Sequence, residues 1–182
     1  VHQWADLSEP DGSFGVSILN DCKYGYDIHN SRMRITLMRA PTCPDRTGDH
    51  GINTFRYAFY PHENDWRQET VQKALAFNIL PVAKYNKDAV EGTLPAESFI
   101  AKTDKKNVII DAIKKAQDGN GYIIRVVEEE QRRGNCRLDL GFAFDKVIEC
   151  NMIEEDKTEI PCDAYGFEFA IKPFEVKTFR VI

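Results

Sequence analysis

The stretch RMRITL, residues 32–37, decides the fold class of this chain. Its apolar residues Met33, Ile35 and Leu37 alternate with polar ones. A period of two is typical of a half-buried antiparallel strand, which turns one face to a core and the other to water.

The same signal recurs along the rest of the sequence. Residues 26–29 join the first strand through Asn30-Ser31, which predicts a β-hairpin. A last strand at 174–182 changes face between Val176 and Phe179, which predicts a bulge or an edge position. The chain is therefore predicted to be all-β. Further strands are expected at 15–19, 54–60, 98–102, 121–128, 136–142, 147–153 and 166–171.

One short helix interrupts the strands. Asp65 is suited to cap a first turn, with Gln68 three residues on, and a helix over 66–76 places Val71 and Ala74 on one face. Residues 107–117 fit both a helical spacing and a period of two. They lead through an acidic glycine turn directly into the next strand, so a strand is predicted there too.

Length and composition indicate a folded globular protein. The 182 residues suffice for one core or for two modest units, and 42% hydrophobic with 29% charged residues leaves no long disordered tract. Residues 81–95 lack periodicity and carry Gly92 and Pro95, so they are predicted to connect two β units.

Charge and hydropathy exclude several partners. The net charge of −5 is spread along the chain without a basic cluster, so we expect no nucleic acid partner. Apolar runs fall far short of the roughly 20 residues of a membrane span, so no membrane partner is expected. An odd number of cysteines without a CxxC pair predicts free thiols in a reducing compartment, which favours the cytoplasm. The five are Cys22, Cys43, Cys136, Cys150 and Cys162.

No motif predicts a catalytic centre within the chain. The four histidines are widely separated, so no metal site is expected, and no nucleophile elbow, P-loop or dinucleotide fingerprint is present. Residues 45–51 have side chains for acid and base chemistry but the composition of an ordinary solvated loop. Residues 128–134 are interpreted as a solvated, charged hairpin tip. Aromatic side chains at strand spacing, such as Phe55, Tyr57 and Phe59, could stack on sugar rings but are interpreted as core.

Several motifs follow one another as they do in a known family. In order and spacing they resemble the C-terminal region of glycoside hydrolase family 38 α-mannosidases, in the cytosolic and bacterial branch. The resemblance extends over nearly the whole chain, but over only the C-terminal minority of a full family member. The motifs are WADLSE (4–9), LNDCKYGYD (19–27), LMRAP (37–41), FRYAFYPHENDW (55–66) and PFEVKTFRV (173–181).

The resemblance implies a retaining α-mannosidase whose chemistry lies elsewhere. In the family, an Asp nucleophile, an Asp acid/base and a zinc ion held by His and Asp come from an N-terminal catalytic region, and nothing in this sequence matches that region. It follows that this chain has no catalytic residue and no cofactor of its own. Zinc, or another divalent metal, is implied for the parent enzyme, with the missing N-terminal region as partner and an α-mannoside as substrate. The absence of an initiator Met agrees with a piece of a longer protein.

The resemblance also implies an architecture. Residues 1–80 would be the end of a large β-supersandwich, residues 81–95 the connection, and residues 96–182 a small C-terminal β-sandwich. A truncated supersandwich exposes strand edges, and such edges predict dimerisation of the fragment.

The loop after the strand at 15–19 is the candidate site. The family's β region can lend a loop to the cleft rim, and Asn20, Asp21, Lys23 and Tyr24 offer donors and acceptors suited to sugar hydroxyls. Asp and Asn in a tight loop before Gly25 equally serve to satisfy backbone amides. An alternative function for the chain is an independent carbohydrate-binding or interaction module.

Overall fold

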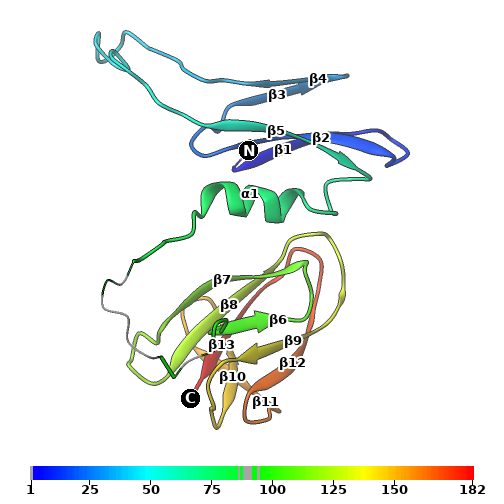
Figure 1. Ribbon diagram of the computed structural model, residues 1–182, viewed down its shortest axis with the longest axis vertical. Helices are drawn as coiled ribbons and strands as arrows, with labels where there is room; N and C mark the ends of the chain where they lie inside the picture. The colour runs from blue at the N-terminus through cyan, green and yellow to red at the C-terminus, as the bar shows by residue number, and fades with distance from the viewer. Residues whose placement is uncertain (1, 86, 88–91, 94) are drawn as a thin grey trace. The chain divides into compact units, whose positions relative to one another are not determined.

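The computed structural model describes residues 2–85, 87, 92–93 and 95–182. The chain divides into two compact units, Val1–Lys87 and Asp88–Ile182. Antiparallel strands dominate both units and one short helix lies in the first, so the predicted all-β fold class is confirmed (Figure 1). In the part of the chain that is described, no helix has the length and hydropathy that a membrane span requires.

The first unit contains a three-stranded sheet and a separate hairpin. In the hairpin, Met33 and Ile35 are half-buried whereas Arg32 and Arg34 are exposed, which confirms the strand predicted from their alternation. Asn30 occupies the turn at φ 48°, a left-handed conformation that Asn tolerates well. The sheet has the order β1-β2-β5, with β1 Trp4–Ser8, β2 Phe14–Asn20 and β5 Tyr57–Glu63, and the hairpin pairs β3 Tyr26–His29 with β4 Arg32–Ile35.

The helix of the first unit starts later than the sequence predicts. It is α1, Thr70–Asn78, rather than 66–76. Asp65 does accept a backbone amide, that of Arg67 at 2.9 Å, but this bond belongs to a separate preceding turn. Glu69 then has φ −149°, far from the roughly −60° of a helix, so the helical path begins only after it. Val71 and Ala74 are buried, as predicted.

The second unit is built from two antiparallel sheets. Residues 107–117, whose sequence fits both a helical spacing and a period of two, contain the strand β7. This strand pairs with β8 across a turn with positive φ at Gly119 and Gly121, so the strand prediction there is confirmed. One sheet has the order β11-β10-β13-β8-β7 and the other β12-β9-β6. The strands are β6 Ala101–Thr103, β7 Val108–Lys115, β8 Tyr122–Glu128, β9 Gly134–Leu140, β10 Val147–Cys150, β11 Asp156–Ile160, β12 Gly166–Ile171 and β13 Val176–Val181.

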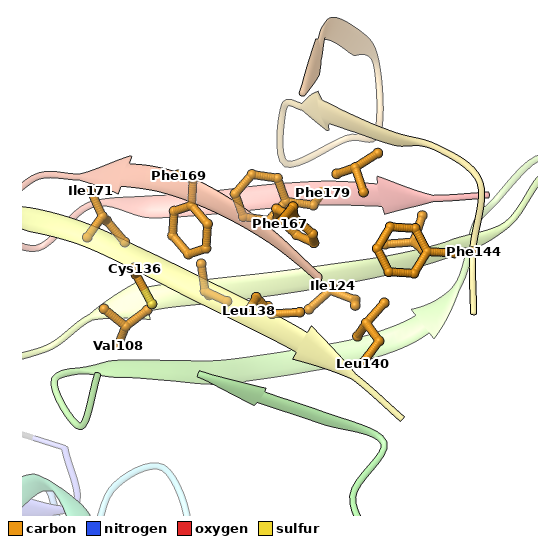
Figure 2. Packing of buried hydrophobic residues seen from close by; sticks show 13 residues of the cluster. Val108, Ile124, Cys136, Leu138, Leu140, Phe144, Phe167, Phe169, Ile171 and Phe179 are labelled. Atoms are coloured by element: carbon orange, nitrogen blue, oxygen red, sulfur yellow. The ribbon is translucent and has the colours of Figure 1, made fainter. Parts of the chain in front are cut away.

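The core of the second unit fills the space between these two sheets. Phe167 and Phe169 of β12 meet Phe179 of β13, with ring centroids 4.9 and 4.8 Å apart (Figure 2). Leu138 of β9 and Ile124 of β8 are almost fully buried beside them. Each of these strands contributes alternate residues, so the period of two in the sequence becomes the inner face of a sandwich.

The last strand is central rather than at an edge, and it has no bulge. β13 pairs with β10 on one side and β8 on the other, in unbroken register. Phe179 points into the core, whereas Arg180 lies on the outer face and is only 4% exposed because Asp118 and Asp156 bind it at 2.8 and 2.9 Å. Val176 lies on the same outer face as Arg180 and is 40% exposed, and this apolar residue on the outer face is why the pattern looked like a change of face.

The predicted charged hairpin tip at 128–134 is wrong in two respects. β8 and β9 belong to different sheets, so the segment crosses between sheets instead of closing a hairpin. Glu128 and Glu130 are fully buried rather than solvated. Burial disfavours the charged form of Glu128, but hydrogen bonds from Asn107 and the backbone amides of Phe174, Arg132 and Glu130 outweigh it and lower its pKa.

Other strand boundaries differ by a few residues. The strand expected at 54–60 is β5, Tyr57–Glu63, which continues through Pro61; a proline is tolerated there because β5 is an edge strand. β11 was not predicted, since four of its five residues are charged or polar and exposed.

Candidate functional site

The candidate loop begins at the last residue of β2, where Asn20 is 1% exposed. Its Oδ1 accepts hydrogen bonds from the backbone N–H groups of Cys22 and Lys23, at 3.1 and 2.5 Å. Its Nδ2 donates to the Tyr26 hydroxyl at 2.5 Å. The side chain of Asn20 therefore folds the loop from inside, as Asn does in turns.

Asp21 ties the loop to the segment before β5. Its carboxylate accepts hydrogen bonds from the backbone N–H and the Nε of Arg56, at 3.1 and 2.9 Å. These bonds, with one from the Cys22 thiol, lower the pKa of Asp21 from 3.8 to about 2. The same carboxylate raises the pKa of Cys22. Asp21 is thus an ionised anchor of the loop.

Lys23 and Tyr24 lie differently from Asn20 and Asp21. The Lys23 ammonium lies 4.9 Å from the ring centroid of Phe55, and Tyr24 is 61% exposed and stacks on His2 with centroids 5.5 Å apart. Both line a hollow of about 430 Å³. A cationic donor and an exposed aromatic ring beside an open hollow can bind a polar ligand.

The structure thus separates the four predicted residues into two pairs. Asn20 and Asp21 satisfy backbone amides, the alternative that the sequence left open, while Lys23 and Tyr24 face the hollow. The hollow is also lined by Arg39, which the sequence analysis assigned to no site, and by Asp49 and Asn53. Asp49 was interpreted as part of an ordinary solvated loop. No local pattern could have identified these residues, since the chain brings them to Lys23 only by folding back.

A buried polar cluster in the first unit also escaped the sequence analysis. His62 Nε2 lies 2.7 Å from Asp6 Oδ2, and both side chains are at most 5% exposed. The Ser17 hydroxyl donates to the same oxygen at 2.7 Å and lies 2.8 Å from the Thr70 hydroxyl at the start of α1. The cluster therefore joins the sheet to the helix. The motifs WADLSE and YPHENDW contain Asp6 and His62, but their partnership is decided by strand register.

The described residues offer no metal centre. They contain no group of three or more His, Cys, Asp or Glu side chains that could hold an ion. Two of the described cysteines, Cys136 and Cys150, are buried free thiols, and burial raises the pKa of Cys136 to about 12. The exposed thiols of Cys22, Cys43 and Cys162 are free as well. None of the described residues is assigned to the zinc that the resemblance implies for a parent enzyme.

Two family profiles match separate parts of the chain. Residues 1–47 match the profile described as the glycosyl hydrolases family 38 C-terminal domain, and residues 107–179 match the profile described as the family 38 C-terminal beta sandwich domain. The first contains the candidate loop and the second contains most of the two-sheet core.

Curated relatives extend this similarity over the whole chain. Alpha-mannosidase G of Dictyostelium discoideum is 36% identical over 100% of the chain, which spans 17% of that protein. Human alpha-mannosidase 2C1 is 31% identical over 85% of this chain, and the aligned region is 15% of the human protein. The alpha-mannosidase of Saccharomyces cerevisiae is 40% identical over 64% of this chain, and the aligned region is 10% of the yeast protein.

A solved structure has the same fold. The crystal structure of an alpha-mannosidase from Enterococcus faecalis V583 aligns with 98% of the chain at a TM-score of 0.76 and 20% identity. The aligned region is 20% of that chain.

Proposed function

The chain belongs to glycosyl hydrolase family 38, of which it carries C-terminal domains, and we propose that it is the non-catalytic β region of an α-mannosidase. The observation that supports this most is the 36% identity to an alpha-mannosidase over the whole chain. Since the chain spans only 17% of that relative, the reaction would take place on residues outside it.

We propose that the parent enzyme releases terminal α-mannosyl residues with retention of configuration. Retaining glycosidases need two carboxyl groups about 5–5.5 Å apart across the scissile bond. We do not propose Asp21 for this pair, because its carboxylate accepts hydrogen bonds from Arg56. The acid/base pair, and zinc or another divalent metal if the parent holds one, would then come from the N-terminal catalytic region.

The domain organisation proposed for the parent follows the predicted boundaries. Residues 1–80 would be the end of the β-supersandwich, residues 81–95 a connection, and residues 96–182 the small C-terminal β-sandwich. The separate three-stranded sheet of the first unit supports this, since β1 and β5 are edge strands in the chain as it stands. Strands of the parent would pair with such edges, and a second copy of the fragment could do so in their place.

The Asn20–Tyr24 loop is proposed to contribute to the rim of the substrate cleft. Lys23 and Tyr24 would contact sugar hydroxyls, while Asn20 and Asp21 hold the loop that presents them. Replacement of Lys23 by Ala in the full-length enzyme is expected to raise the KM for an α-mannoside. An unchanged KM would remove Lys23 from the cleft.

An aryl α-mannoside assay tests the proposal as a whole. The 182-residue chain is compared with the longest native chain that contains it, with and without a chelator. Activity only in the longer chain, lost with chelator, is expected. Turnover by the fragment alone would contradict the proposal. Saturable binding of mannose oligomers by the fragment would favour an independent carbohydrate-binding module.

A further inference from the structure

The hollow beside Lys23 and Tyr24 has a second side, which residues of the segment 36–53 supply. Arg39, Asp49 and Asn53 line it along with the loop residues. Its volume of about 430 Å³ falls in the range of roughly 300–1,000 Å³ that is usual for small-molecule sites. The two segments belong to the same unit, so the hollow is formed within one compact part of the chain.

The charges that line this hollow are available to a ligand. Arg39 and Asp49 are exposed, and neither side chain forms an ion pair or hydrogen bond with another residue in the described ranges. The Lys23 ammonium lies over the Phe55 ring and forms no ion pair or side-chain hydrogen bond with another described residue. Surface charges of opposite sign that share a hollow without pairing leave their hydrogen-bonding capacity open.

Local hydrogen bonds fix the position of Asp49. Its backbone has φ 61°, and its carbonyl accepts a hydrogen bond from Asn53 Nδ2 at 3.0 Å. Asn53 Nδ2 also donates to the Gly51 carbonyl at 3.4 Å, where Gly51 has φ 114°. Both bonds use the Nδ2 group of Asn53, so its Oδ1 remains an acceptor. The turn thus holds Asp49 and Asn53 together at one side of the hollow.

We propose that Arg39, Asp49 and Asn53 complete a hexose-binding site with Lys23 and Tyr24. The proposal rests on the proposed function of the loop and adds residues to it. The carboxylate accepts from hydroxyls, the two cations donate, and the Asn side chain can accept, which matches the alternating donors and acceptors of a polyol. Leu37 and Met38 line the same hollow and offer apolar surface to the C–H face of a sugar ring.

The test uses the full-length enzyme with an α-linked mannose disaccharide as substrate. Asp49→Asn removes the charge and keeps the turn, since Asn tolerates the left-handed conformation well. Arg39→Gln is a second variant that does not depend on this turn. Each is expected to raise KM about tenfold, the loss of one charge-assisted hydrogen bond, with kcat retained. Arg46→Ala is the matched control, an exposed residue of the same segment that does not line the hollow.

The KM of a third variant, Lys23→Ala, distinguishes a failure of this inference from a failure of the proposed function. If Lys23→Ala raises KM while Asp49→Asn and Arg39→Gln do not, the proposal that Arg39 and Asp49 bind the sugar is refuted, whereas the loop is still assigned to the cleft. If none of the three changes KM, both are overturned. If all three raise KM while Arg46→Ala does not, the site stands. Thermal unfolding of each variant identifies any increase in KM that comes from a loss of folded protein.

Discussion

Asn20 and Glu128 show how one buried side chain can fix a turn. Each has a side-chain oxygen that accepts two or more hydrogen bonds. Two of these bonds come from backbone N–H groups two to four residues later in the chain. The local sequence suggested this role for Asn20, since Asn before a tight turn commonly satisfies backbone amides. For Glu128 the local sequence predicted a solvated side chain instead, because a run of three glutamates is usually solvated.

Glu128→Gln is expected to lower the free energy of unfolding of the second unit by about 3 kcal/mol, because an amide accepts through one oxygen only and leaves a buried donor unsatisfied. Urea denaturation with fluorescence detection measures this. Glu168→Gln is the control, an exposed carboxylate on β12. Equal stability of the two variants would contradict the role given to Glu128.

Asp21 predicts a pH dependence of stability. Its pKa falls from 3.8 to about 2 on folding, so its ionised form stabilises the folded state above pH 3.8 and this contribution is lost as the pH falls through about 2. Asp21→Asn should cost about 1 kcal/mol at neutral pH, since Arg56 is half exposed and solvent screens the pair.

The difference between Asp21→Asn and the unmodified chain should therefore shrink as the pH is lowered from 3.8 to about 2. Urea denaturation across this range checks it. Asp27→Asn, which breaks an exposed pair with Arg34, serves as the comparison. A difference for Asp21→Asn that does not change with pH would exclude the carboxylate as its source.

At the scale of elements, turns decide which strands pair. The β7–β8 turn carries Gly119 and Gly121 at φ 80° and 83°, a region that other residues rarely adopt. A Cβ at Gly121 would overlap the Val181 carbonyl oxygen of β13, whereas a Cβ at Gly119 would meet no atom within 4 Å. The two glycines thus share a backbone conformation but differ in their surroundings.

Gly119→Ala is expected to lower the free energy of unfolding by about 1–2 kcal/mol, the cost of the left-handed conformation alone. Gly121→Ala should cost at least about 1 kcal/mol more, because the end of β13 must also move. Thermal and urea unfolding of the two variants give the comparison directly. If both substitutions lower the free energy of unfolding by the same amount, the close approach of Gly121 to Val181 does not contribute to the cost of substitution.

At the scale of the whole molecule, the two units differ in how continuous their buried apolar core is. The second has a continuous apolar core of phenylalanine and aliphatic side chains between two sheets. In the first, Val71, Ala74 and Leu19 are buried alongside the polar residues Asp6, Ser17 and His62. Hydrophobic periodicity predicts a continuous apolar core well, but it does not predict a buried cluster of polar residues.

The sequence by itself determined the all-β class, the β3–β4 and β7–β8 hairpins and the presence of one helix, because alternation and turn residues act over a few neighbouring positions. Its motifs also predicted the family. Only the tertiary structure decided that Glu128 is buried, that β13 is central, and that Arg39 and Asp49 share a hollow with Lys23. These features depend on which distant segments meet, because part of what compensates a buried charge comes from residues far away in the chain, as Asn107 and Phe174 do for Glu128.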